Sequence, residues 1–256
     1  MNFPEAIFLA ILQGITEWLP ISSSGHLLIA QKLLNIDAPV SFDAALHFGT
    51  LLSVLAYMRK ELCEIACAIV KPDLKSENGR LGVYVIIATI PAAAAGLLLK
   101  KHIEYLFTSL SAVAAGLLFT GLLLFISRKH IKSEKVTGRK SLIVGLMQAV
   151  AITPGVSRSG STISTALILG IERKSAAKFS FLLSVPVILG ATVLQAKDLF
   201  NSNLDITMVG ASIIVSAAVG YASIRLLWKT ILEEKFHLFA FYCWAAGLAL
   251  VLLQIL

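Results

Sequence analysis

The chain consists of long apolar stretches that are separated by short polar segments. Six of the stretches are long enough to cross a bilayer as helices, because about 20 apolar residues span its hydrocarbon core. The predicted spans are roughly 41–58, 81–99, 110–127, 176–196, 207–228 and 236–256. This pattern predicts an all-α polytopic membrane protein with six transmembrane helices.

Two further apolar regions, 3–35 and 141–170, are interrupted in the middle by proline, glycine and serine. The interruptions read LPISSSGH at 19–26 and TPGVSRSGST at 153–162. Each arm has only about 10 to 17 residues, which is too short to cross a bilayer comfortably. We therefore predict two re-entrant helical hairpins, since irregular backbone at membrane depth must be buried in protein or line a wet cavity.

The composition agrees with a membrane protein. Of the 256 residues 57% are hydrophobic and only 14% are charged, whereas soluble domains contain about 25% charged residues. The first apolar segment has no small-residue cleavage site, so we expect no cleavable signal peptide. The three cysteines form no disulfide framework. The net charge of +7 does not predict nucleic-acid binding, because in a membrane protein the distribution of charge matters more than its sum.

The basic residues are distributed unequally between the loops. Of the 22 Lys and Arg, 17 fall in segments that we place on the inside: 59–80, 128–140, 171–178 and 225–237. Four fall outside, namely Lys32, Lys100, Lys101 and Lys197, and the remaining one is Arg158. By the positive-inside rule both termini lie outside. The first hairpin then enters from the outside and the second from the inside.

Opposite entry of two hairpins implies an inverted repeat, and two short internal matches support one. They are FGTLLSV (48–54) with FSFLLSV (179–185), offset by 131 residues, and SSSG (22–25) with SRSG (157–160), offset by 135. In both halves a hairpin precedes three spans. Two inverted halves whose hairpin tips meet near the midplane resemble the architecture of many secondary transporters. We expect a single integral membrane domain, 1–256, with repeat one at about 1–127 and repeat two at about 141–256.

Polar residues at membrane depth are few and gather in the two hairpins. Gln13 and Glu17 are four residues apart, so their side chains share one face of a helix. Ser23 and His26 open the second arm and can point towards the same space. Ionisable residues inside a membrane are expensive and by default indicate function.

The second hairpin predicts an anion site. Ser157, Arg158, Ser159 and Thr162 stand where a helix begins, and a helix N-terminus offers free N–H groups and partial positive charge. Phosphate fits best, because a guanidinium can bind it with two parallel hydrogen bonds. An oxyanion of the substrate, together with Glu17, would compensate the charge of Arg158.

The two motifs, QGITEWLPISSSGH (13–26) and PGVSRSGST (154–162), resemble those of the undecaprenyl-diphosphate phosphatase, or bacitracin-resistance, family. The resemblance covers essentially the whole chain. It implies an enzyme that removes the terminal phosphate from a C55 isoprenoid diphosphate at the outer face of the plasma membrane. It also implies recycling of the lipid carrier for cell-wall precursors and the use of a divalent cation. The site residues carried over by motif are Gln13, Glu17, Ser23, His26, Ser157, Arg158 and Thr162.

Roles within this site can be assigned as hypotheses. We expect Glu17 to bind Mg²⁺ or Ca²⁺ together with the diphosphate, and Gln13, a neutral donor, to add little to metal affinity. The favoured nucleophile is Ser23, activated by His26 with Glu17 orienting the imidazole; His26 itself or a metal-bound water remains open. His47 fits either the site or helix packing, and packing is favoured.

Other functions remain as alternatives. The inverted repeat also fits a transporter or flippase of a phosphorylated lipid, and Arg158 could merely pair with a carboxylate to join the hairpins. A type-2 phosphatidic acid phosphatase is disfavoured, since Ser164 and Ile168 stand where its histidine and aspartate would be. The expected partners are an isoprenoid diphosphate lipid and the bilayer, without nucleic acid. The oligomeric state is open, a homodimer included.

Overall fold

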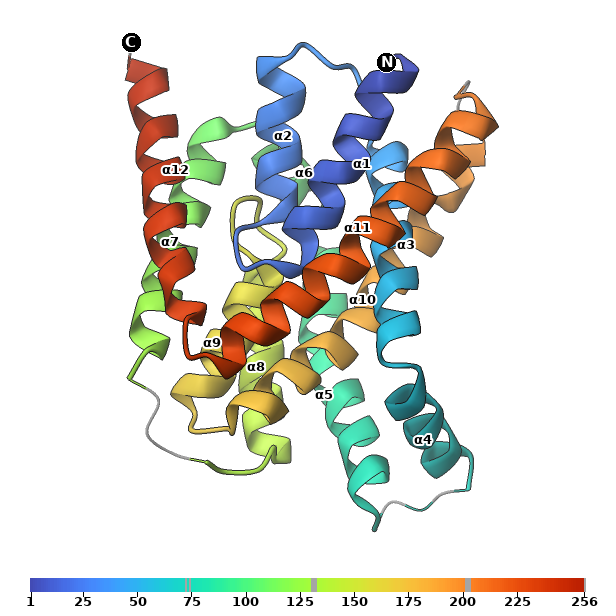
Figure 1. Cartoon of the computed structure of the whole chain (residues 1–256), viewed down its shortest axis with the longest axis vertical. Coiled ribbons are helices and arrows are strands. Elements are labelled where there is room, and N and C mark those ends of the chain that lie inside the picture. The colour runs from blue at the N-terminus through green and yellow to red at the C-terminus, as the bar shows by residue number, and fades with distance from the viewer. Residues whose placement is uncertain (72, 74, 130–132, 201–203, 256) are drawn as a thin grey trace.

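The structure, a computed structural model, describes the whole chain except residues 72, 74, 130–132, 201–203 and 256 (Figure 1). The described residues form helices and no strand; an isolated β-bridge joins Glu134 and Ile171. The helices are α1 (Phe3–Trp18), α2 (Ser23–Leu33), α3 (Val40–Tyr57), α4 (Arg59–Val70), α5 (Glu77–Leu98), α6 (Lys100–Leu106), α7 (Leu110–Ser127), α8 (Gly138–Val150), α9 (Arg158–Ile168), α10 (Arg173–Phe200), α11 (Ile206–Leu232), the 3-10 turn η1 (Phe236–Leu238) and α12 (Phe239–Ile255).

The prediction of an all-α membrane protein with six spans is confirmed. Helices α3, α5, α7, α10 and α11, and η1 continued by α12, are long and apolar enough to cross a membrane. Their ends lie within a few residues of the predicted ones. Helix α5 begins earlier than expected because Ser76 caps it, its Oγ accepting the Gly79 N–H at 3.1 Å. Helices α4 and α6 are not predicted from the sequence. Their charged residues favour loops between the spans, and the structure shows short helices there.

Each interrupted region forms a pair of helices that fold back on each other. Helices α1 and α2 enter from one end of the molecule, and α8 and α9 from the other (Figure 1). The connecting turns, 19–22 and 151–157, both lie in its middle. The helix–turn–helix form is therefore as expected, and the re-entry of these pairs within a bilayer stays a prediction.

Local sequence explains both turns. Ser22 adopts a positive φ of 70° and caps α2, its Oγ accepting the Gly25 N–H at 3.3 Å. Gly155 has a φ of 87°, and a Cβ there would lie 2.2 Å from the Val113 carbonyl oxygen. Both the backbone conformation and the lack of space therefore require glycine at that position.

Each half of the chain packs its hairpin against a span of the other half. Helix α1 lies on α11, and α8 lies on α5. The first crossing is close because Gly14 lacks a Cβ, which would lie 2.7 Å from the Cβ of Val219. Packing of each hairpin on a span of the other half is what two interlocked halves would produce. The two termini lie at the same end of the molecule (Figure 1), while the division into two repeats stays a prediction.

Candidate active site

The tips of the two hairpins touch each other. A Cβ on Gly25 would lie 3.2 Å from Cα of Gly155, so the backbones are in contact. The Ser159 hydroxyl of the second hairpin donates to the Leu19 carbonyl of the first at 3.2 Å. The polar residues that the sequence predicted on separate hairpins are thereby brought to one place.

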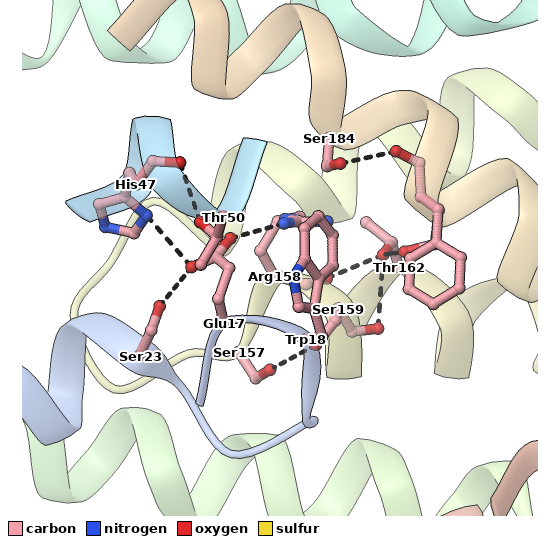
Figure 2. A network of polar contacts seen from close by, with 12 residues as sticks. Glu17, Trp18, Ser23, His47, Thr50, Ser157, Arg158, Ser159, Thr162 and Ser184 are labelled. Carbon is pink, nitrogen blue, oxygen red and sulfur yellow. Dashed lines mark hydrogen bonds and ion pairs between the residues drawn. The ribbon is translucent and has the colours of Figure 1, made fainter. Parts of the chain in front are cut away.

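Glu17 is the centre of the site (Figure 2). Its Oε1 accepts from Nη2 of Arg158 at 2.7 Å, and its Oε2 accepts from the Ser23 hydroxyl at 2.7 Å. The side chains of Glu17 and Arg158 are only 6% and 13% exposed. The predicted compensation of the arginine by this carboxylate is therefore present as a buried ion pair, and charge-assisted bonds of this length are strong.

Gln13 lies on the same face of α1 as Glu17, one turn earlier. Its Nε2 donates to Glu17 Oε2 at 3.0 Å. Its carbonyl oxygen, Oε1, is buried without a hydrogen-bond partner among the described residues. Because a buried carbonyl without a partner is costly, this oxygen is a candidate ligand atom.

His47 reaches the same carboxylate from α3. Its Nδ1 lies 3.1 Å from Glu17 Oε2 (Figure 2). The same nitrogen lies 2.8 Å from Gln13 Nε2. Sequence reasoning favoured a packing role, and the structure instead places the imidazole in the site. The signal that could have found it was the polar pair of Asp43 and His47 in an apolar span; the Asp43 carboxylate itself accepts from Gln31.

The guanidinium of Arg158 is only partly engaged. One terminal nitrogen, Nη2, is bound to Glu17, whereas Nη1 is buried without a partner. The guanidinium carbon lies 5.2 Å from the ring centroid of Trp18, and Trp18 is in turn fixed by a bond from Nε1 to the Ser53 hydroxyl at 3.0 Å. One nitrogen of a well-positioned cation thus remains free to bind an anion.

Three predicted site hydroxyls of the second hairpin, those of Ser157, Ser159 and Thr162, are engaged with protein atoms. Ser157 caps α9 by accepting the Gly160 N–H at 3.1 Å, and its Oγ lies 3.2 Å from that of Ser159. The Thr162 hydroxyl donates to the Arg158 carbonyl at 2.8 Å and lies 2.6 Å from the Ser180 hydroxyl. These contacts hold Arg158 in place, and direct binding of substrate by Ser157, Ser159 and Thr162 stays a prediction.

His26 does not form the expected pair with Ser23. Its Nδ1 lies 2.8 Å from the Ser22 carbonyl and its Nε2 lies 2.7 Å from the Tyr242 hydroxyl. Since a carbonyl only accepts, Nδ1 carries the hydrogen and Nε2 accepts from the tyrosine. The imidazole also stacks on the Tyr242 ring, with centroids 5.7 Å apart. The hydrogen-bond partner of Ser23 is Glu17.

The side chains of the site can be assessed as ligands of the predicted divalent cation. Among the described residues, no three His, Cys, Asp or Glu form a group that could hold a metal. Two side chains offer suitable oxygens: Glu17 through its carboxylate and Gln13 through its unpartnered Oε1. Such a pair fits a hard cation that keeps its waters and takes further oxygens from a bound ligand.

The fold and this site define a multi-pass helical membrane protein with a buried carboxylate–guanidinium pair shared between two helical hairpins. Residues 6–249 match the family described as bacitracin resistance protein BacA, and the chain belongs to this family.

Relatives from archaea and bacteria are similar over almost the full length. An undecaprenyl-diphosphatase of Methanosphaera stadtmanae is 36% identical over 100% of this chain and 99% of its own. Proteins of the same name from Desulfosudis oleivorans (39% identical, 95% of each chain) and Halothermothrix orenii (38% identical, 99% of this chain and 98% of its own) are comparably close.

Proposed function

We propose that this protein is a membrane phosphatase that hydrolyses undecaprenyl diphosphate to the monophosphate and inorganic phosphate. This activity recycles the lipid carrier of cell-envelope glycans and confers resistance to bacitracin. The names of the family and of the full-length relatives support it. The observation that carries the proposal is the Glu17 carboxylate, which binds a nucleophile candidate, Ser23, on one oxygen and Arg158 on the other.

Arg158 and the beginning of α9 bind the diphosphate. The free Nη1 of Arg158 and the N–H groups at the helix N-terminus supply positive charge in a buried place. The same donors stabilise the charge that spreads over the oxygens of the transferred phosphoryl group. The diphosphate binds at Nη1 while Nη2 stays on Glu17.

Ser23 is the nucleophile and Glu17 its base. Ser23 Oγ attacks the terminal phosphorus and passes its proton to Glu17 Oε2, which already accepts its hydrogen bond at 2.7 Å. The bond from phosphorus to the bridging oxygen breaks, and the polyprenyl monophosphate leaves. Glu17 passes its proton to the departing monophosphate. Water then attacks the phosphoserine, Glu17 relays the proton of the water to Ser23 Oγ, and inorganic phosphate leaves. The hydrogen bonds thus favour Glu17 over His26 as the group that activates the serine.

Glu17 and Gln13 Oε1 would hold a Mg²⁺ or Ca²⁺ ion, which supplies charge neutralisation for the diphosphate when bound. With one carboxylate already paired to Arg158, the free protein should bind metal weakly and mainly together with substrate. Calorimetric titration of Mg²⁺ with and without a non-hydrolysable diphosphate analogue measures this. Tight binding without the analogue, unaffected by Glu17→Gln, would contradict it.

The enzyme acts in the cell membrane with its site open to the outer face. This placement rests on the 17 basic residues in the predicted inner segments against four outside. The first hairpin, which carries Ser23 and Glu17, then enters from the outer side.

The direct test is phosphate release from undecaprenyl diphosphate by the purified protein in detergent micelles with Mg²⁺. We expect turnover by the wild type and its loss in Glu17→Gln. Lys235→Gln serves as the matched control, because Lys235 is exposed and its ammonium binds Glu233, away from the site. Movement of the lipid between the leaflets of vesicles that contain the purified protein, without phosphate release, would instead identify a flippase.

A further inference from the structure

His47 stands at the site without belonging to either hairpin. It comes from α3, and its Nδ1 is 2.8 Å from Gln13 Nε2 and 3.1 Å from Glu17 Oε2. The packing of α3 against α11 has its own polar contact next to His47, in which the Ser216 hydroxyl donates to the Leu46 carbonyl at 2.9 Å. This packing does not use the imidazole. The place of the imidazole is therefore explained by its contacts with Gln13 and Glu17.

The hydrogen-bond chemistry supplies that reason. The amide nitrogen of Gln13 carries two hydrogens and cannot accept. It lies within bonding distance of two acceptors, Glu17 Oε2 at 3.0 Å and His47 Nδ1 at 2.8 Å. One hydrogen goes to each, so Nδ1 acts as an acceptor and the other ring nitrogen carries the imidazole hydrogen. Nδ1 also lies 3.1 Å from Glu17 Oε2, and the amide group between these two acceptors offsets their repulsion.

The consequence is a fixed orientation of a buried amide. Gln13 is fully buried, and its oxygen has no partner in the described structure. Without an acceptor at position 47, one amide hydrogen would lose its bond, and only the contact with Glu17 Oε2 would still oppose a half-turn of the amide. That half-turn would bring Oε1 against Glu17 Oε2, and two acceptors at that distance repel each other.

We propose that His47 is a positioning residue that holds the Gln13 amide with its nitrogen towards Glu17, and thereby holds Glu17 Oε2 on Ser23. This role rests on the proposed phosphatase function. The other carboxylate oxygen is held by Arg158, which does not depend on His47. Loss of His47 should therefore impair the chemical step and leave binding of the diphosphate nearly unchanged.

The test compares His47→Leu, which removes the acceptor, with His47→Asn, whose Oδ1 can accept near the place of Nδ1. We expect kcat to fall about tenfold to a hundredfold in His47→Leu, as for other misplaced catalytic groups. KM should change less than about twofold, and His47→Asn should recover most of the loss. Ser216→Ala, which removes the adjacent bond to α3, is the control for packing and should behave as wild type.

A double-mutant cycle with Gln13→Leu tests whether His47 acts through the amide. If it does, His47→Leu adds little further loss of kcat in the Gln13→Leu background, because the two residues act as one unit. If the losses of kcat in the two single variants multiply in the double variant, the proposal is overturned. It is also overturned if kcat of His47→Asn is no higher than kcat of His47→Leu. His47→Ala replaces His47→Leu should the larger side chain prevent folding.

The same assays separate the two hypotheses. A wild-type protein that releases no phosphate overturns the proposed function. An active wild type with an equally active His47→Leu overturns only the role of His47.

Discussion

Arg158 shares its guanidinium between a structural and a proposed functional partner, because Nη2 binds Glu17 while Nη1 stays free. A lysine has the same charge at a single point, so it can satisfy the carboxylate or the phosphate but not both. We expect Arg158→Lys to lower kcat/KM for undecaprenyl diphosphate by at least about a hundredfold. Turnover within twofold of wild type would show that Arg158 only joins the hairpins.

Ser23 and His26 can be told apart by the covalent intermediate. If Ser23 is the nucleophile, Ser23→Ala abolishes turnover, and acid-stable, base-labile phosphate is trapped on the wild-type protein. An acid-labile adduct that persists in Ser23→Ala and disappears in His26→Ala would assign the attack to His26. Partial activity of both variants without any adduct would favour water as the nucleophile.

At the scale of elements, an aromatic contact joins α12 to the first hairpin. Tyr242 stacks on His26 and also donates to its Nε2, while the Ser22 carbonyl holds the opposite ring nitrogen. Stacking of this kind contributes about 0.5 to 1.5 kcal/mol. It should therefore keep the imidazole in place when only the tyrosine hydroxyl is lost.

We accordingly expect Tyr242→Phe to retain kcat within about threefold, since the stacked ring remains. If His26 takes part in the reaction, Tyr242→Ala should lose at least about tenfold, because the imidazole can then turn about a soft torsion. Steady-state assays of the two variants check this. If phenylalanine proves as damaging as alanine, the hydroxyl and not the ring is what His26 requires.

For the whole molecule, the predicted topology places the two ends of α3 on opposite sides of the membrane. Asp37 precedes this span, and Cys63, which is exposed on α4, follows it. In intact cells, a membrane-impermeant thiol reagent should label Asp37→Cys, made in a Cys63→Ser, Cys67→Ser background. The native Cys63 should react only after permeabilisation. Labelling of both without permeabilisation would refute the inverted arrangement.

Much of this architecture could be predicted because hydrophobic length is a local property of the chain. The spans and the interrupted regions follow from it, and so does the shared face of Gln13 and Glu17. The ion pair of Glu17 with Arg158 could be anticipated, since a buried cation needs a counter-charge and Glu17 was the carboxylate within the motifs.

The remaining contacts could not be predicted, because they depend on how distant helices cross. His47 meets Glu17 only through the packing of α3 beside α1, and Tyr242 meets His26 across 216 residues of sequence. The partner of the Thr162 hydroxyl, Ser180, likewise lies on another helix. Residue types at fixed spacing cannot reveal such pairs.

The separation of Glu17 and Arg158 by 141 positions has a consequence for biogenesis. The ribosome delivers the glutamate with the first helix, long before its arginine partner emerges. Until α9 arrives, the nascent chain must keep the carboxylate protonated or in contact with water, since an unpaired charge in hydrocarbon is costly. The amino-terminal half alone thus cannot complete the site, and a chain cut between α7 and α8 would regain activity only where both pieces are inserted together.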